Sequence, residues 1–174
     1  MTPVDLAFED SHGGGEPVVL AHAIGCDRRM WDDLAARLAE SFRVIRFDAR
    51  GHGRSPVTPR PYSLSGLADD ARALLDCLAI EKAHWVGLSM GAMIGMAFAI
   101  EHPGRLGRLV LANTTSSYGP EGRGMWAARA KAVKDGGLEA IKDMVMSRYF
   151  SEGFRAARGD VVATVAERFL ATPA

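Results

Sequence analysis

The sequence predicts an α/β fold built on a parallel sheet. Apolar runs of strand length alternate with helical patterns along the first part of the chain, an order typical of strand–helix–strand crossovers. The run at 17–22 is continuously apolar, as expected of a strand buried on both faces of a parallel sheet. After residue 113 only helical patterns follow. We therefore expect a core over residues 1–114 and a helical lid over residues 115–174.

Each expected element rests on a local pattern. Strands are expected where short apolar or alternating runs end in turn residues, at 4–8, 17–22, 43–48, 83–86 and 109–113. Helices are expected where apolar residues recur at helical spacing, at 29–40, 64–78, 90–100, 125–134, 138–147 and 161–170. Ser63 is the predicted N-cap of the second of these helices. The last three helices would cover the C-terminal edge of the sheet as a lid, or one sheet face as a helical tail.

Composition argues against several classes of partner. Lysine plus arginine and aspartate plus glutamate both number 21, and the arginines form no basic stripe, so neither a nucleic acid nor a membrane surface is expected as partner. The N-terminus lacks a signal-peptide pattern, and the apolar run at 90–100 is too short to span a bilayer. Cys26 and Cys77 lack metal-ligand spacing. A cytoplasmic protein without a metal or cofactor is therefore expected.

The pentapeptide Gly87-Leu88-Ser89-Met90-Gly91 lies between an expected strand and an expected helix. In that context a Gly-x-Ser-x-Gly sequence forms a nucleophile elbow, a tight turn that lifts the serine Oγ clear of the sheet. The glycines two before and two after the serine avoid clashes with neighbouring chain segments. Ser89 is therefore the predicted nucleophile.

A second loop follows the strand at 17–22, at the edge of the sheet where ligands bind in open α/β folds. Its sequence is His22-Ala23-Ile24-Gly25. Backbone N–H groups are fixed in place before negative charge develops on a reacting carbonyl oxygen. We expect the N–H groups of Ile24 and Met90 to form such an oxyanion hole.

A third loop, Asp-Ala-Arg-Gly-His-Gly-Arg-Ser at 48–55, follows the next strand. Asp48 and Arg50 are expected to form an ion pair that fixes this loop. Asn113 and Thr114, at the end of the last strand, are expected to cap and shape the loop that follows.

The order His-x-x-Gly, Asp-x-Arg-Gly-x-Gly-x-Ser and Gly-x-Ser-x-Gly resembles the α/β-hydrolase superfamily over residues 4–113. The stretch at 82–91 and three stretches of the expected lid are similar to the 3-oxoadipate enol-lactonases. The lid stretches are Met125-Trp126-Ala127-Ala128-Arg129, Gly136-Gly137 and Arg148-Tyr149-Phe150.

This resemblance implies cleavage of a small-molecule ester or lactone through an acyl-serine intermediate, without a cofactor. The specific reaction it implies is the opening of 3-oxoadipate enol-lactone in the β-ketoadipate pathway of aromatic degradation. It also implies that the lid holds a substrate carboxylate, with Trp126, Arg129 and Arg148 as candidate contacts. A serine at position 89 excludes the haloalkane-dehalogenase and epoxide-hydrolase relatives, which have an aspartate there.

The acid and the histidine of a catalytic triad are not found at the places in the chain where the superfamily has them. Its chain order is Ser, then Asp or Glu, then His. The one histidine after Ser89 is His102, near the far end of the expected helix and about 20 Å away at 1.5 Å per residue. The later acids Asp135, Asp143 and Asp160 lie in the expected lid. We expect the chain to be the N-terminal two-thirds of an enzyme whose C-terminal strands, Asp and His come from a missing segment or a second chain.

The sequence is also compatible with several alternatives. His22, Asp48 and Ser89 could form a complete triad, or His52 could be the base, whereas otherwise His22 would brace the oxyanion loop. The activity could be that of a broad carboxylesterase or a perhydrolase-like enzyme. The chain could also be an inactive fragment or a non-catalytic binding protein of the same fold. Without further strands, the sheet would show an open edge and an uncovered apolar face.

Overall fold

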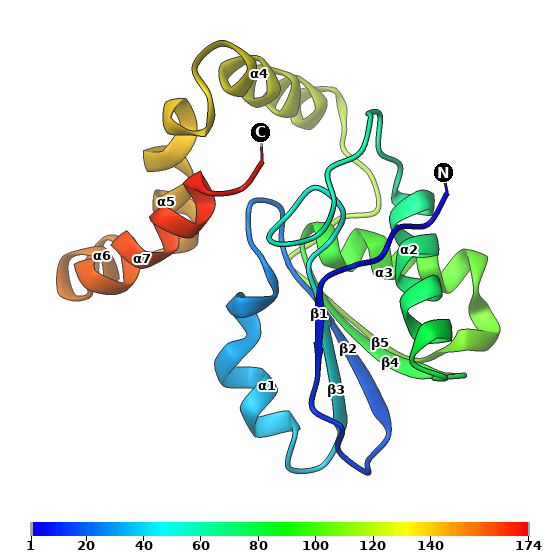
Figure 1. The fold of residues 1–174 in the computed structure, drawn as a ribbon. Coiled ribbons are helices and arrows are strands. Elements are labelled where there is room, and N and C mark those ends of the chain that lie inside the picture. The colour runs from blue at the N-terminus through cyan, green and yellow to red at the C-terminus, as the bar shows by residue number, and fades with distance from the viewer. Residues whose placement is uncertain (1, 174) are drawn as a thin grey trace. The chain divides into compact units, whose positions relative to one another are not determined.

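The computed structural model describes residues 2–173, and the chain divides into two compact units, residues 1–116 and 117–174. The first unit holds the sheet, and the described elements of the second are all helical (Figure 1). The elements of the first unit are β1 (Phe8–Asp10), β2 (Pro17–Ala21), the 3-10 helix η1 (Arg28–Trp31), α1 (Asp32–Leu38), β3 (Arg43–Phe47), α2 (Leu64–Cys77), β4 (Ala83–Leu88), α3 (Met90–Glu101), the 3-10 helix η2 (Pro103–Arg105) and β5 (Leu106–Ala112).

The five strands form one sheet in the order β1-β3-β2-β4-β5. Strands β2, β3, β4 and β5 are parallel, and β1 pairs with β3 in the antiparallel direction. The predicted parallel α/β core is thus confirmed. Because the loops after β2, β3, β4 and β5 all leave the same edge of the sheet, the three motif loops and residues 113–114 lie at that edge (Figure 1).

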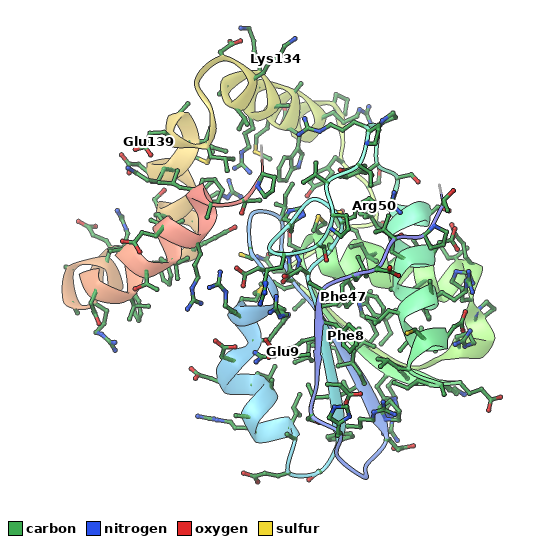
Figure 2. The ribbon with its side chains drawn as sticks, viewed as in Figure 1. Phe8, Glu9, Phe47, Arg50, Lys134 and Glu139 are labelled. Carbon is green, nitrogen blue, oxygen red and sulfur yellow. The ribbon has the colours of Figure 1, made fainter. Side chains whose placement is uncertain are left out.

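The first strand lies further along the chain than its sequence pattern predicts. It was expected at 4–8, but β1 begins at Phe8, which pairs with Phe47 of β3 (Figure 2). The preceding backbone is bound elsewhere, since the Val4 N–H donates to Asp70 Oδ1 at 3.0 Å and the Ala7 N–H to Ser55 Oγ at 2.8 Å. The Ala7 carbonyl still accepts from the Asp48 N–H at 2.8 Å, but the strand pairing with β3 starts only at Phe8.

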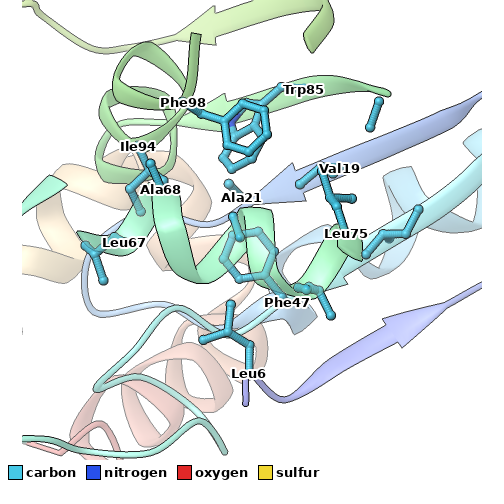
Figure 3. Packing of buried hydrophobic residues seen from close by; sticks show 14 of the residues in the cluster. Leu6, Val19, Ala21, Phe47, Leu67, Ala68, Leu75, Trp85, Ile94 and Phe98 are labelled. Carbon is cyan, nitrogen blue, oxygen red and sulfur yellow. The ribbon is translucent and has the colours of Figure 1, made fainter. Parts of the chain in front are cut away.

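Side chains alternate between the two faces of the sheet, and each face is covered by different helices. On one face α2 and α3 pack over a cluster centred on Phe47, Trp85 and Phe98 (Figure 3). Trp85 and Phe98 stack at 5.3 Å between ring centroids. The opposite face buries a smaller cluster beneath α1, made of Val18, Leu20, Ala35 and Val44.

The edge of the sheet at β5 is open among residues 2–173, because no described strand pairs with its outer side. Val110 is 52% exposed and Leu111 is 42% exposed, although they point to opposite faces. The open edge and uncovered apolar surface expected from the sequence are therefore present in this chain.

The second unit contains α4 (Pro120–Gly136), the 3-10 helix η3 (Leu138–Ile141), α5 (Lys142–Tyr149), α6 (Glu152–Ala157) and α7 (Gly159–Leu170). Its own core is formed by Val145, Met146 and Phe169. The helices expected at 125–134 and 161–170 are present with longer bounds, and the one expected at 138–147 is divided into η3 and α5. The short helix α6 is additional and is capped by the Ser151 hydroxyl. Among the described residues, no helix combines the length and apolarity that crossing a membrane requires.

Candidate active site

Ser89 is the residue between the end of β4 and the start of α3. Its backbone has φ 52° and ψ −110°, a conformation that non-glycine residues rarely adopt. Such strain persists only where the surrounding structure holds it, and it is concentrated at functional sites. The structure thus has the strand–turn–helix geometry of a nucleophile elbow at Ser89.

The glycines on both sides of Ser89 are required by close backbone contacts. A Cβ placed on Gly87 would lie closer than 3.0 Å to the backbone of Gly91, and one placed on Gly91 would lie that close to the Ala21 carbonyl of β2. The Trp85 indole Nε1–H donates to the Gly91 carbonyl at 3.0 Å. These contacts keep the first turn of α3 tightly packed against β2 and β4.

The loop after β5 fixes the backbone of the elbow. The Ser89 N–H donates to the Ala112 carbonyl at 2.9 Å, and the Thr114 hydroxyl donates to the Ser89 carbonyl at 3.1 Å. Asn113, between them, has a left-handed φ of 43°, which asparagine tolerates better than most residues. The loop-shaping role expected of Asn113 and Thr114 agrees with these bonds. The Ser89 side chain itself is half-buried and makes no helix-capping bond.

The two expected oxyanion donors follow the C-terminal ends of β2 and β4, Ile24 in a loop and Met90 at the start of α3. Ile24 is 45% exposed in the loop after β2 and is followed by Gly25 at φ 71°. The Cys26 N–H donates to the Ala23 carbonyl at 3.1 Å, which closes this loop into a tight turn. Met90 is the first residue of α3, where N–H groups have no acceptor within the helix. The assignment of both N–H groups to an oxyanion hole stays a prediction.

His22 connects two loops through both of its ring nitrogens. Its Nδ1 lies 2.8 Å from the Ala23 carbonyl, and its Nε2 accepts from the Ala49 N–H at 2.8 Å. The hydrogen is therefore on Nδ1. A triad of His22, Asp48 and Ser89 would need Nε2 for the serine and Nδ1 for the carboxylate, so that alternative is wrong. The bonds agree with the interpretation that His22 braces the oxyanion loop.

Asp48 is fully buried, and its partners differ from the expected one. Its carboxylate accepts from the Arg28 N–H at 2.8 Å, from Arg28 Nη1 at 2.5 Å and from the Arg54 N–H at 2.8 Å. Arg50 instead pairs with the buried Asp70 of α2, with Nη2 and Oδ1 2.5 Å apart. The expected Asp48–Arg50 pair is therefore wrong. Arg28 was missed because it comes from η1, and no local pattern marks it as a partner of Asp48.

His52 lies against His22 with ring centroids 5.1 Å apart. Burial and the neighbouring His52 lower the pKa of His22 from 6.5 to about 4, and burial also lowers the pKa of His52. His22 is therefore neutral at pH 7. The Nδ1 of His52 lies 3.2 Å from the Arg50 carbonyl. These contacts do not test whether His52 is the catalytic base, so that alternative stays a prediction.

His102 lies at the C-terminal end of α3, a twelve-residue helix with Ser89 at its other end. At 1.5 Å per residue this places it about 20 Å from Ser89, as expected. Its Nε2 lies 3.2 Å from Asp69 Oδ1. Asp69, Glu101 and His102 could supply metal ligands, since their ligand atoms lie within 4.8 Å of one another, but this group is remote from Ser89 and such exposed acidic groups are common without a metal.

The three candidate substrate contacts all lie in the second unit, on α4 and α5. The Arg129 guanidinium lies over the Trp126 ring at 4.8 Å, and its Nη2 lies 3.3 Å from Met144 Sδ. Tyr118 meets the same Trp126 ring edge-on at 6.0 Å between centroids. Arg148 is exposed. The structure thus brings Trp126 and Arg129 together, and their role in substrate binding stays a prediction.

Comparisons with known proteins agree with this arrangement. A family model described as alpha/beta hydrolase fold matches residues 16–165. The chain is 36% identical over 137 residues to 3-oxoadipate enol-lactonase 2 of Acinetobacter baylyi, covering 79% of this chain and 51% of that protein. The crystal structure of the enol-lactonase from Burkholderia xenovorans LB400 matches with a TM-score of 0.91 and 34% identity, covering 98% of this chain and 66% of that one.

A thermophilic esterase from Thermogutta terrifontis matches with a TM-score of 0.90 and 33% identity, covering 98% of this chain and 63% of that one. The chain spans about half the length of the curated relatives it matches. The sequence motifs, the sheet topology, the geometry at Ser89 and the similar proteins all indicate the same family. The chain belongs to the alpha/beta hydrolase fold family.

Proposed function

We propose that this chain is part of a serine hydrolase that opens a lactone or cleaves a carboxylic ester, with Ser89 as nucleophile. The observation that carries the proposal is the strained backbone of Ser89, at φ 52°, directly before the first turn of α3. A serine held in this way presents its Oγ beyond the sheet edge, beside N–H groups that can stabilise an oxyanion. Similarity to proteins named 3-oxoadipate enol-lactonase supports 3-oxoadipate enol-lactone as the substrate.

In the proposed reaction, Ser89 Oγ attacks the carbonyl carbon while a histidine takes its proton. The negative charge that forms on the carbonyl oxygen would be stabilised by the N–H groups of Ile24 and Met90. The bond between the carbonyl carbon and the ring oxygen then breaks, and the leaving oxygen takes the proton from the histidine. Water, deprotonated by the same histidine, releases the acid and restores the Ser89 hydroxyl.

The proposed base is a histidine outside these 174 residues, on another segment or a second chain, paired with an acid from the same source. The placement of three of the five histidines supports this, and His52 stays the alternative base within the chain. His22 has both nitrogens engaged, and His102 lies at the far end of α3. His84 lies near the start of β4 and accepts from the Arg108 N–H. It is therefore at the N-terminal end of the strand, whereas Ser89 follows the C-terminal end.

Labelling with a fluorophosphonate probe tests the nucleophile. In the native protein that contains this chain, we expect the adduct on Ser89, and Ser89→Ala should abolish labelling and lower kcat by about 10⁴-fold or more. Ser65→Ala is the matched control, because Ser65 is an exposed α2 serine bonded to Glu101. Labelling that persists in Ser89→Ala, or an unlabelled wild-type protein, would contradict the proposal.

The substrate is tested by comparing kcat/KM for 3-oxoadipate enol-lactone with that for p-nitrophenyl acetate. We expect a strong preference for the lactone. The second candidate function is that of a broad carboxylesterase, which the likeness to the Thermogutta terrifontis esterase favours. A strong preference for the simple ester would select that second candidate and leave Ser89 as nucleophile.

A further inference from the structure

Three side chains that can ligate a metal ion meet at the end of α3 that is farthest from Ser89. Glu101 is the last residue of α3, His102 follows it, and Asp69 lies on the neighbouring helix α2. Their ligand atoms, one carboxylate oxygen from each acid and one imidazole nitrogen, all lie within 4.8 Å of one another. Among residues 2–173, these side chains form the one group of this kind.

The imidazole of His102 is held in a defined direction. Its ring meets the buried Phe98 ring edge-on, at 5.2 Å between centroids. The backbone N–H of His102 donates to the Phe98 carbonyl at 2.8 Å, and Pro103 restricts the backbone conformation of the residue before it. In this orientation Nε2 faces α2 and lies 3.2 Å from Asp69 Oδ1.

The two carboxylates of the group are oriented by α2 without being neutralised. The Ser65 hydroxyl donates to Glu101 Oε2 at 3.0 Å. The Arg72 guanidinium approaches Asp69 Oδ1 only to 3.9 Å, whereas its Nη1 pairs with Asp76 at 2.5 Å. The group therefore places two negative charges at the C-terminal end of α3, where the helix dipole also favours a cation.

We propose that Asp69, Glu101 and His102 bind a divalent transition-metal ion, with Zn²⁺ as the expected ion. Zn²⁺ takes mixed imidazole and carboxylate ligands at about 2.0–2.2 Å, so two ligands of one ion lie at most about 4.4 Å apart. Because Glu101 is exposed, a small rotation of its side chain is enough to close the observed separations to this limit. Mg²⁺ and Ca²⁺ prefer oxygen ligands, so the imidazole disfavours them.

Metal binding would change the tautomer of His102. Its Nε2 faces a carboxylate oxygen, which only accepts hydrogen bonds, so Nε2 carries a hydrogen in the structure. An imidazole nitrogen that ligates a metal carries none, so in a neutral ring the hydrogen moves to Nδ1. Asp69 Oδ1 then loses this hydrogen bond and becomes a metal ligand instead.

Other contacts between a histidine and a carboxylate in the described chain lack a third ligand. His84 lies 3.3 Å from Glu16, and His12 lies 3.5 Å from Asp10, which is already paired with Arg43. An exposed acidic pair alone does not indicate a metal. The oriented imidazole beside two acids distinguishes the group at the end of α3.

A metal ion at this place would join α2 to α3, the two helices that cover one face of the sheet. It would take no direct part in the reaction proposed for Ser89, which lies at the other end of α3. The proposal is therefore independent of the proposed function. An ion that binds only the folded chain stabilises it by mass action, so its expected effect is a higher Tm.

Calorimetric titration of the full chain with zinc chloride at pH 7.5, after removal of metal ions with a chelator, tests the site. We expect one Zn²⁺ per chain and a higher Tm in its presence. Magnesium and calcium chloride should bind about tenfold more weakly or less. Long-range ¹H–¹⁵N spectra of the histidine rings should show His102 changing from the Nε2–H to the Nδ1–H tautomer on Zn²⁺ binding, whereas His22 should not change.

Variants decide whether these three side chains are the ligands. Glu101→Gln and His102→Gln should each weaken Zn²⁺ binding about tenfold or more. His12→Gln is the matched control, because His12 also lies beside an acid but without a third ligand. Cys77→Ser removes the exposed thiol of α2 and should bind Zn²⁺ as the wild type does, as should Ser89→Ala.

The proposal is overturned if Zn²⁺ binding is not saturable, if it is unchanged in Glu101→Gln, or if it is lost in His12→Gln or Cys77→Ser. Equal affinities for Zn²⁺ and Mg²⁺ would also overturn it, because they would show attraction by charge alone. Should His102→Gln fail to fold, Glu101→Gln and the tautomer of His102 in the wild type still give the decision, since Glu101 is exposed.

Discussion

Replacing His22 by glutamine should remove a pH dependence from the stability of the fold. Burial lowers the pKa of His22 in the folded chain from 6.5 to about 4, with His52 as a second cause. In the unfolded chain the pKa returns to about 6.5. Between these values the unfolded state binds more protons than the folded state, so acid favours unfolding. The stability that neutral His22 contributes is fully present above pH 6.5 and is lost as pH falls toward 4.

The size of the effect follows from the same two pKa values. A pKa lowered from 6.5 to about 4 corresponds to about 3 kcal/mol of folding free energy, most of which is lost by pH 4.5. Glutamine does not titrate. At pH 7.5, however, the substitution itself should cost roughly 1–3 kcal/mol, because the buried Ala49 N–H or the Ala23 carbonyl loses its partner.

Urea denaturation followed by circular dichroism at pH 4.5, 5.5, 6.5 and 7.5 measures both effects. The His22→Gln variant should be less stable than the wild type at pH 7.5, and the difference should shrink by about 2–3 kcal/mol at pH 4.5. His12→Gln is the control, because the His12 side chain is 81% exposed. Glu9 and Asp10, whose pKa values are lowered, titrate below this range in every variant. Parallel pH profiles for the wild type and His22→Gln would refute the reasoning.

Two substitutions test the packing that positions the site. Gly91→Ala should lower Tm by about 2–8 °C in calorimetry, since overpacking of about 2–3 kcal/mol exceeds the gain in helix propensity of about 1 kcal/mol. Gly153→Ala, in open space on α6, should not lower Tm, and equal Tm values for the two variants would contradict the packing argument. Asp48→Asn should cost about 3–5 kcal/mol in urea denaturation, because it removes the buried carboxylate at Arg28 Nη1 and leaves Arg28 with only the more exposed Glu9 as its anion. The surface variant Asp135→Asn should show no measurable loss, and an equally small loss for Asp48→Asn would contradict the role of the buried pair.

Most of the core could be predicted from the sequence because its signals are local. A continuous apolar run marked β2, and the predicted N-cap Ser63 is confirmed because its hydroxyl accepts from the Gly66 N–H at 3.0 Å. The elbow could be predicted because strand, turn and helix are consecutive in the chain. The predictions that were wrong concern features that depend on contacts between residues far apart in the sequence. The backbone before β1, for example, is bound by Asp70, which is 66 residues from Val4.

The error in the loop after β3 has the same origin. Asp48 and Arg50 are two residues apart, so sequence proximity made them an expected pair. In the structure each one finds a partner 20 residues away, Arg28 and Asp70 respectively. Buried charges pair with whichever opposite charge the packing places nearest, and local spacing carries no information about that. The group of Asp69, Glu101 and His102 was likewise unpredictable, because the sequence does not show which side chains the packing of α2 against α3 brings together.

The strained backbone of Ser89 is maintained by the sheet rather than by its own sequence. Its N–H is bonded to the last residue of β5, and its carbonyl accepts the Thr114 hydroxyl. The turn that follows is held against Ala21 at the end of β2, and the Trp85 indole of β4 bonds to the Gly91 carbonyl. Three neighbouring strands thus fix a single residue in a conformation that costs roughly 1–3 kcal/mol. A serine so constrained loses little further freedom when a substrate binds, which is the property that a preorganised nucleophile requires.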